Sequence, residues 1–243
     1  MSAPPSQLRI LPSGDQALTV EFGEEIDPAL NARVLELDRK ATGLRGIVET
    51  IPTYRSLLVV YDPAVVGFRE LGDSLLELSA DLTGEEATGT VWDIPVCYGG
   101  PHGIDLEATA KTHEITPDEL VRRHLAPTYR CYMIGFLPGF AYLGGLDQTI
   151  ATPRRVSPRL ETPAGTISIG GIQALVASLK APSGWHLLGR TPVRNFVPSR
   201  DPAVIVRPGD GVKFRRIDEA DFARLDREAE AGGRIAAPLE AAA

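Results

Sequence analysis

After Arg130 the sequence consists of short apolar runs that alternate with glycine and proline, and no other feature constrains the fold so strongly. The runs are too short for amphipathic helices, and the residues between them are typical of tight turns. Short strands at regular spacing, joined by such turns, predict a β-barrel or a β-sandwich. The predicted strands cover residues 166–169, 175–177, 185–188, 203–206 and 212–214, and residues 206–212 are expected to form strand, turn and strand.

The first ninety residues carry a different pattern, in which strand and helix signals alternate. Residues 17–22 alternate apolar and polar side chains, and residues 56–61 form a strongly apolar run, so both are predicted strands. Asp27 and Pro28 suit the N-cap and first position of a helix that ends near Gly43. Leu71, Leu75 and Leu78 lie along one face of a second helix. Two helices on a small sheet predict an α/β sandwich.

A polar stretch at residues 81–89 separates these two patterns. It predicts a domain boundary, with an N-terminal α/β domain at residues 1–88 and a second domain at 89–225 that begins with a strand at 91–98. From Asp226 the chain is rich in alanine and glutamate and has little to bury. Residues 226–243 are therefore expected to form a flexible tail.

The second domain is expected to begin with two short helices. Asp105 can cap a helix at residues 106–112, and Thr116 with Glu119 matches a capping box. Two successive helices also suggest a DNA-binding helix-turn-helix. The connection is not the usual tight turn, however, and the chain carries 32 acidic against 25 basic residues, a net charge of −7. Because DNA binding needs a basic face, this alternative is disfavoured.

Composition also bears on the cellular compartment. The two cysteines, Cys97 and Cys131, are far apart and do not form a secreted disulfide pattern, so we expect free thiols. The N-terminus lacks the basic and apolar segments of a signal peptide. No run approaches the ~18 apolar residues of a membrane span. These features predict a cytoplasmic protein.

Several catalytic motifs are absent from the sequence. It contains no GxxxxGK[ST] phosphate loop, no GxSxG and no HExxH. His102, His113 and His124 are evenly spaced, but glycine and proline interrupt any helix that would align them, so no metal site is expected. The chain could therefore be a binding module or one component of a multi-chain enzyme.

The segment GFLPGFAYLGGL, residues 135–146, holds four glycines, one proline and no charge. Glycine permits backbone conformations closed to other residues and lets a ligand or another chain approach closely. The polar side chains of Arg154, Gln173, His186 and Arg190 follow it and could orient a small polar ligand. Glycines that only solve corner geometry in a tightly turned barrel are the alternative, and the residues alone leave both interpretations open.

The segments YMIGFLPGFAYLGGLD, ATPRR, TPAGTISIGGIQ and GWHLLGRTP resemble one known family. It contains the B subunit of 5-oxoprolinase, the Kip-type inhibitors of sporulation kinases and allophanate hydrolase subunit 1. The resemblance covers nearly the whole chain, because residues 14–17, 54–57, 95–100 and 207–210 also match. It implies an α+β fold, with a small N-terminal α/β sandwich domain followed by a cyclophilin-like β-barrel domain.

The resemblance also implies a function. A 5-oxoprolinase complex hydrolyses 5-oxo-L-proline to L-glutamate and uses ATP, with Mg expected beside it, to activate the amide carbonyl. The implied partners are proteins like the A and C subunits of 5-oxoprolinase, the latter related to the carboxyltransferase half of urea carboxylase. The chain alone is then expected to be inactive.

A site at the barrel follows from this interpretation. Arg190 could hold the substrate carboxylate in bidentate fashion, His186 could transfer protons, and Gln173 would border the same site. The uncharged loop is expected to lie where a partner or substrate approaches, since charged residues are depleted at interface cores. The residues expected to contact substrate or partner are Gly135, Phe136, Pro138, Gly139, Phe140, Arg154 and Thr191.

Three other functions remain open at this stage. The chain could be an inhibitory binding protein of a sensor histidine kinase, or a subunit in urea or allophanate breakdown. A prolyl isomerase would rest on fold analogy alone. The shared motifs belong to all members of the family, so they do not separate these functions.

Overall fold

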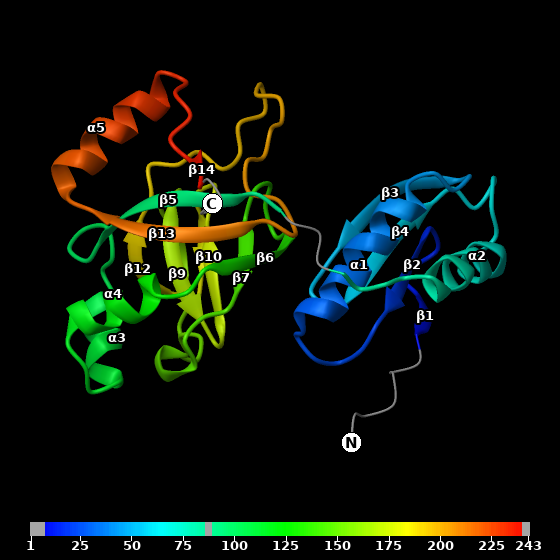
Figure 1. Ribbon diagram of the computed structural model, residues 1–243, viewed down its shortest axis with the longest axis horizontal. Helices are drawn as coiled ribbons and strands as arrows, with labels where there is room; N and C mark the ends of the chain where they lie inside the picture. The colour runs from blue at the N-terminus through cyan, green and yellow to red at the C-terminus, as the bar shows by residue number, and fades with distance from the viewer. Residues whose placement is uncertain (1–7, 86–88, 240–243) are drawn as a thin grey trace. The chain divides into compact units, whose positions relative to one another are not determined.

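The structure, a computed structural model, describes residues 8–85 and 89–239, which form two compact units at residues 1–88 and 89–243 (Figure 1). Residues 1–7, the start of the segment that lacks signal-peptide features, lie outside the described residues. So do residues 86–88 of the predicted boundary and residues 240–243 of the predicted tail. Within the described ranges, no helix is long and apolar enough to cross a membrane.

The first unit is a four-stranded antiparallel sheet with strand order β1-β2-β4-β3 and two helices. Leu18 and Val20 of one strand and Leu57 and Val59 of the next are fully buried at alternate positions, so they share the face that the helices cover. The elements are β1 (Arg9–Pro12), β2 (Ala17–Glu21), α1 (Pro28–Ala41), β3 (Ile47–Pro52), β4 (Ser56–Tyr61) and α2 (Phe68–Ala80).

The two central strands and the two helices of this unit were predicted correctly, and the two edge strands were not predicted. Asp27 is the N-cap of α1, and its side chain accepts a hydrogen bond of 2.8 Å from the backbone N–H of Leu30. The unpredicted strands β1 and β3 are the two edges of the sheet. Neither contains a buried residue, so neither shows the alternation that identifies a half-buried strand.

The second unit is a closed barrel of seven strands, which confirms the expected α+β class. The strands follow the order β12-β9-β10-β7-β6-β13-β5, and β5 pairs again with β12. Among these barrel pairings, only that of β5 with β13 is parallel. The barrel strands are β5 (Val91–Tyr98), β6 (Tyr129–Ile134), β7 (Ala141–Gly144), β9 (Thr166–Gly170), β10 (Gln173–Val176), β12 (His186–Arg190) and β13 (Gly211–Ile217).

Barrel closure depends on a close approach of two backbones at Gly189. This residue pairs with Tyr98, and a Cβ atom added to it would lie 2.6 Å from the carbonyl oxygen of Cys97. Real side chains cannot tolerate that distance to backbone, so the closing pair requires glycine. Inside the barrel, Ile94, Ile167 and Leu188 are fully buried in one continuous core.

Shorter elements surround the barrel. Two helices pack on one another and contribute Leu106 and Leu120 to the barrel core. A two-stranded sheet, separate from the barrel ladder, is made by β8 and β11. These elements are α3 (Leu106–Thr112), α4 (Pro117–Leu125), η1 (Gln148–Ile150), β8 (Arg159–Thr162), β11 (Ala181–Ser183), α5 (Glu219–Glu230) and β14 (Ala237–Pro238).

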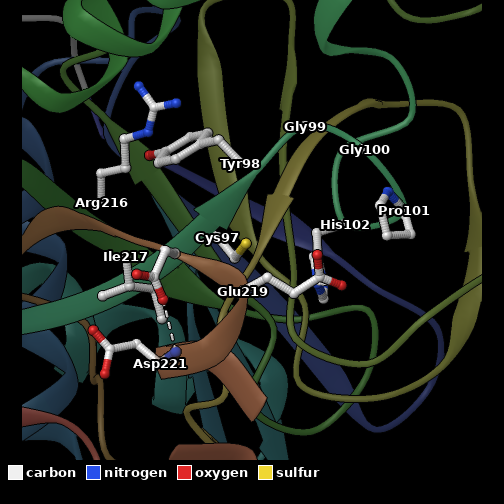
Figure 2. A pocket seen from close by; sticks show the side chains of 11 residues that line it. Cys97, Tyr98, Gly99, Gly100, Pro101, His102, Arg216, Ile217, Glu219 and Asp221 are labelled. Atoms are coloured by element: carbon white, nitrogen blue, oxygen red, sulfur yellow. Dashed lines mark hydrogen bonds and ion pairs between the residues drawn. The ribbon is translucent and has the colours of Figure 1, made fainter. Parts of the chain in front are cut away.

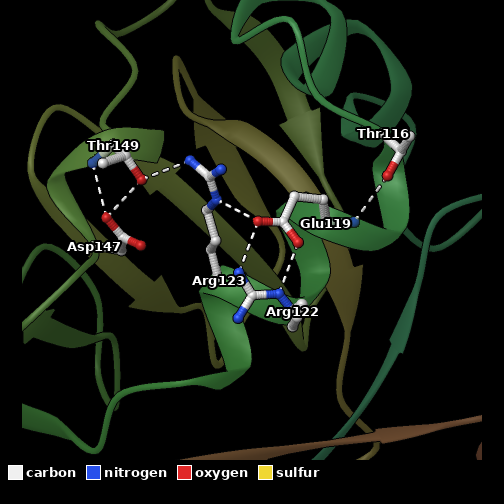
Figure 3. Close-up of polar contacts among 6 residues, drawn as sticks. All are labelled: Thr116, Glu119, Arg122, Arg123, Asp147 and Thr149. Atoms are coloured by element: carbon white, nitrogen blue, oxygen red, sulfur yellow. Dashed lines mark hydrogen bonds and ion pairs between the residues drawn. The ribbon is translucent and has the colours of Figure 1, made fainter.

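The predicted capping box at α4 forms only in half. The Thr116 hydroxyl accepts from the backbone N–H of Glu119 at 3.2 Å, but the Glu119 carboxylate accepts from Arg122 and Arg123 instead of reaching back (Figure 3). Hydrogen bonds from Arg122 and then Arg123 lower the pKa of Glu119 to about 2. Arg123 also donates to the Thr149 hydroxyl at 2.9 Å, which ties α4 to η1.

The predicted helix cap at Asp105 is wrong in one respect. Asp105 is the N-cap residue of α3, but its side chain makes no capping hydrogen bond. The carboxylate instead accepts 2.6 Å from Arg159 and 2.8 Å from the backbone N–H of Leu187. A buried carboxylate gains more from a guanidinium and a buried backbone amide than from a helix end near solvent.

The predicted strand at residues 203–206 is also wrong. Only one isolated bridge, between Val204 and Phe196, forms in this described segment. The buried amide of Asn195 holds the segment instead, because it accepts from the backbone N–H of Val206 at 2.8 Å. Arg200 donates to nearby carbonyl oxygens, among them that of Ala203 at 3.0 Å. Side chains thus satisfy the polar backbone groups that a ladder would otherwise pair.

The predicted flexible tail is ordered over its described part, residues 226–239. Helix α5 continues to Glu230, and Ala236 is buried in the barrel core. Strand β14 pairs with β5, and Arg234 lies over the Trp92 ring at 4.8 Å. Ile235 also packs against this core, but one isoleucine beside small alanines makes no periodic apolar pattern that the sequence would show.

The closure geometry leads to a stability prediction. Gly189→Ala places a methyl group against backbone, and overpacking of this kind costs roughly 1–3 kcal/mol or more. Denaturant unfolding should therefore show a clear loss for Gly189→Ala. Gly184→Ala is the matched control in the same unit, because an added Cβ there meets only ordinary contacts beyond 3.4 Å. Equal stability of the two variants would contradict the role of Gly189 in closure.

Candidate functional site

The loop between β6 and β7, which the sequence singles out, is held rigidly in place. Gly139 adopts a φ of +76°, and a Cβ there would lie 2.6 Å from the Cβ of Phe196. The Ser178 hydroxyl donates to the carbonyl oxygen of Pro138, and the buried Asn195 amide donates to that of Gly139 at 2.7 Å. Glycine here serves tight packing, and buried polar side chains fix the loop.

The loop presents Phe136 to its surroundings. This residue has a φ of +67°, in a region that residues other than glycine rarely adopt, and its side chain is 64% exposed. Its ring meets the Phe140 ring edge to face at 5.6 Å between centroids. Strained backbone of this kind persists only where the surrounding structure determines it.

Beside this loop lies a cavity of about 230 Å³, which we call the aromatic cavity. Tyr142 and Leu175 are partners across β7 and β10, and they alternate with residues that face the barrel core, so this cavity lies on the outer face of the barrel wall. The Trp185 ring meets the Tyr142 ring at 5.9 Å. The lining residues are Phe136, Phe140, Tyr142, Arg154, Arg155, Pro158, Leu175, Pro182, Ser183, Gly184 and Trp185.

The charged residues that line this cavity are both arginines. The Arg154 guanidinium lies 5.3 Å from the centroid of the Trp185 ring, a cation–π arrangement. Arg155 and Arg159 share the carboxylate of Asp105, at 3.4 and 2.6 Å. Because Asp105 also binds the backbone of β12 at Leu187, it fixes the segment that carries Arg154 and Arg155 against the barrel.

The predicted catalytic residues do not form one cluster. On β9, Gly170 pairs with Gln173 and the adjacent Ile169 pairs with His186, so these two residues lie near one end of the strand but on opposite faces of the sheet. His186 Nε2 lies 2.9 Å from the carbonyl oxygen of Pro153. A carbonyl can only accept, so Nε2 carries the proton and Nδ1 is the basic nitrogen.

Arg190 lies at the other end of that strand, which corrects the predicted shared site. It pairs with Thr166, three residues and about 10 Å of strand from the partner of His186. Its Nε donates to the Ala164 carbonyl oxygen at 3.2 Å, and its guanidinium lies 5.4 Å from the Phe222 ring centroid. Burial lowers the pKa of Arg190. Its neighbours are therefore those of α5, not those of the aromatic cavity.

Thr191 is a further correction, because it was predicted to contact a ligand or partner. It is fully buried, and its hydroxyl accepts from the backbone N–H of Val193 at 3.2 Å. Two residues that form walls of the cavity, Tyr142 and Trp185, were not predicted as site residues. For Tyr142 the sequence did contain a usable pattern. It follows Phe140 by two positions, and this spacing places two residues on the same face of a strand.

A second cavity, of about 590 Å³, lies where the 97–102 segment meets the start of α5 (Figure 2). His102 Nε2 is 3.9 Å from the Glu219 carboxylate, beyond hydrogen-bond distance. Burial, followed by Arg190, lowers the pKa of His102, while burial, Glu219 and Asp218 raise the pKa of the Cys97 thiol. At neutral pH the imidazole is therefore uncharged and the sulfur remains a thiol, which is a weak nucleophile.

The two cavities differ in the charge of their lining residues, and therefore in the ligands that they favour. The second cavity is lined by Asp218, Glu219 and Asp221 against one cation, Arg216. The aromatic cavity is lined by two cations and no carboxylate from the described residues. A small anion is therefore favoured in the aromatic cavity and repelled from the second. No group of three or more His, Cys, Asp or Glu side chains within residues 8–85 and 89–239 could hold a metal ion.

These features define a two-part chain, an α/β unit and a closed barrel with an anion-attracting aromatic cavity on its outer wall. The chain belongs to the family of carboxyltransferase domains, subdomains C and D, whose model matches residues 8–206.

Relatives named as the B subunit of 5-oxoprolinase confirm the resemblance seen in the sequence. The chain is 38% identical over 225 residues to that of Bacillus subtilis, covering 86% of this chain and 92% of the relative. It is 35% identical over 207 residues to that of Haemophilus influenzae, covering 85% and 97%. A urea amidolyase of Lachancea kluyveri is 22% identical, and the match covers 14% of its length.

Solved structures agree with the architecture. A conserved uncharacterized protein from Pyrococcus horikoshii is 43% identical, with a TM-score of 0.54, and the match covers 88% of this chain and all of that one. The urea amidolyase of Kluyveromyces lactis has a TM-score of 0.80 over 96% of this chain and 16% of that chain. At 18% identity this second likeness shows the fold alone.

His124 provides a test of the barrel's electrostatics. It is fully buried between Phe214 and Tyr129, its Nδ1 lies 2.8 Å from the Tyr98 hydroxyl, and burial lowers its pKa to about 3. Since the unfolded imidazole titrates near 6.5, its contribution to stability is present above that pH and is lost as the pH falls toward 3.

We expect this single group to cost about 3 kcal/mol of unfolding free energy between pH 6.5 and pH 4. Denaturant unfolding across this pH range should show that loss. The variant His124→Phe keeps a ring between its two aromatic neighbours but cannot titrate, so its stability should fall less steeply with acid. Parallel pH profiles for the two proteins would contradict the assignment.

Proposed function

We propose that this chain is a subunit of an ATP-dependent 5-oxoprolinase complex, which hydrolyses 5-oxo-L-proline to L-glutamate. The single observation that carries the proposal at the site is the aromatic cavity, which has ring walls, two arginines and no carboxylate among its described lining residues. The names of three relatives at 34–38% identity support the same substrate.

The cavity and the substrate are complementary in size and charge. 5-Oxo-L-proline is a five-membered lactam with one carboxylate. A space of about 230 Å³ suits a small ring and lies below the ~300–1,000 Å³ of drug-sized ligand sites. Trp185 and Tyr142 supply apolar walls for the ring, and Arg154 supplies the cation for the carboxylate. Arg154 thus replaces Arg190 as the proposed carboxylate partner.

The proton-transfer role stays with His186 in this proposal. His186 is not itself a lining residue of the aromatic cavity, but its Nε2 is committed to Pro153, the residue next to the lining residue Arg154, so Nδ1 is the nitrogen left to accept a proton. Gln173 lies near the same end of β9 and would orient polar atoms of the substrate. Lactam hydrolysis adds water to the carbonyl carbon and breaks the ring C–N bond, and the new amine must gain a proton.

Neither of these two cavities fits ATP. The aromatic cavity is too small, and the larger cavity is lined by three carboxylates that repel phosphate. The sequence has no phosphate-binding glycine loop. We therefore propose that ATP and its Mg bind on two partner proteins, which are like the A and C subunits of 5-oxoprolinase, and that this chain alone is inactive.

An omission experiment tests the complex. This chain is combined with its two proposed partner proteins, and 5-oxo-L-proline-dependent glutamate formation and ATP hydrolysis are measured with each of the three left out in turn. We expect glutamate only when all three are present. No glutamate from an assembled complex would contradict the proposal, and allophanate would then be the next amide to assay.

A pair of variants tests the assignment within the site. Loss of a charge-assisted hydrogen bond costs about 1.5–3 kcal/mol, so Arg154→Ala should raise the substrate KM of the complex about tenfold or more. Arg190→Ala, at the far end of β12, should leave KM within about twofold. A KM raised only by Arg190→Ala would return the carboxylate to the site predicted from the sequence.

A further inference from the structure

Four large apolar side chains are exposed on segments that line the aromatic cavity or adjoin its lining residues. Val156 is 102% exposed and Leu160 93%, the two highest values among the large apolar residues that the structure describes. Phe136 is 64% exposed and Ile172 51%. We call these four residues the apolar rim.

One rim residue lines the cavity, and the other three lie next to or opposite residues that line it or pack against its wall. Phe136 lines it directly, and Val156 follows the lining residue Arg155. Leu160 lies on β8, which pairs with β11, the strand that supplies the lining residues Pro182 and Ser183.

Ile172 belongs to the β9–β10 turn, and this turn also reaches the cavity. A Cβ on Gly170 of this turn would lie 2.7 Å from the Trp185 ring, so the turn packs directly beneath that cavity wall. Gly171 forms a bridge with Thr152, just before the segment that carries Val156.

This clustering calls for a partner. Single exposed apolar residues are ordinary, but several on the segments around one cavity are typical of an interaction site. Ten large apolar residues in the described chain are exposed, and four of them belong to the apolar rim. Nothing in the barrel's own packing requires Val156 or Leu160 to be apolar, since both project into solvent.

The charge of the same region fixes the chemistry of that partner. Arg155 and Arg159 share the single carboxylate of Asp105, and Lys180 pairs with Glu161 at 2.7 Å. Arg154 adds a further cation at the cavity. The region is therefore basic within a chain of net charge −7, so a complementary surface must carry carboxylates beside its apolar side chains.

The backbone of the β6–β7 loop is braced within this chain alone. Phe136 holds its positive φ in a loop braced by Ser178 and Asn195. An exposed aromatic side chain that loses little freedom on contact is an efficient interface anchor.

We infer that the apolar rim is the docking surface for a segment of one of the two partner proteins of the complex, one that presents apolar side chains flanked by carboxylates. Docked there, the segment covers the mouth of the aromatic cavity and excludes water from it. The inference rests on the proposed function, because it takes the partner from the same complex.

The test measures binding, not activity. The double variant Val156→Ser/Leu160→Ser removes apolar surface without touching a cavity-lining residue. Its Kd for each of the two purified partner proteins is measured by biolayer interferometry beside the wild type. We expect at least a tenfold weaker Kd for one of them, since loss of buried interface side chains commonly costs that much. Val48→Ser is the matched control, because Val48 is 70% exposed in the first unit and lies outside the rim; its Kd should stay unchanged.

A second arm tests the charge of the partner. Arg154→Glu should weaken binding of the same partner protein at least tenfold, and raising the salt concentration should weaken the wild type more than the variant. Unchanged Kd values for the rim variant, or failure of both partner proteins to bind the wild-type chain, would overturn the inference. So would a wild-type dimer that the rim variant turns into a monomer, because the occupant would then be a second copy.

The two proposals fail in different ways. If the complex assembles through the rim but forms no glutamate, the docking surface stands and the 5-oxoprolinase proposal falls. If glutamate forms and the rim variant binds normally, the function stands and the docking surface falls.

Discussion

The second unit depends on one close contact, the pairing of β12 with β5 at Gly189. Two residue pairs join these strands, and one of them places backbone so near that no side chain fits. Without this pairing the seven strands would form an open sheet with two edges. Closure also fixes β12 along its length. His186 at one end therefore lies beside Pro153, and Arg190 at the other end lies beside Phe222 of α5.

The site follows from how the outside of this closed wall is used. Within β7 and β10, alternate residues fill the barrel, so the remaining residues must face outward. Tyr142 and Leu175 are among them, and they would be exposed if the β8–β11 pair and Trp185 did not lie against them. Asp105 holds this cover, because one carboxylate binds Arg155, Arg159 and the backbone of Leu187. A buried carboxylate shared in this way is costly to break, which makes the cavity a preformed feature.

The sequence predicted those elements whose pattern is strong over a full period. The strands at Ala17–Glu21, Ser56–Tyr61 and Val91–Tyr98 and the start of α1 at Asp27 were identified closely. Prediction failed where side chains replaced regular pairing. Asn195 and Arg200 hold residues 203–206 without a ladder, and Ile235, Ala236 and the short strand β14 attach the end of the described chain to the barrel. Of the residues predicted to contact substrate or partner, Phe136, Phe140 and Arg154 line one cavity. The distance of Arg190 from that cavity was not predicted, because sequence order along β12 does not reveal that Phe222 of α5 lies beside one end of the strand.

The properties of the site also explain why so uncharged and rigid a loop is useful. A loop that only turned a barrel corner would need Gly139 but would not need Phe136 held out at 64% exposure in a strained conformation. A site complete in one chain would cover its apolar margin with its own residues, whereas here Val156 and Leu160 remain in solvent. Strained backbone is kept where structure over-determines it, and exposed apolar surface is kept where another surface covers it. Together these two features favour a site that is built on one chain and closed by another.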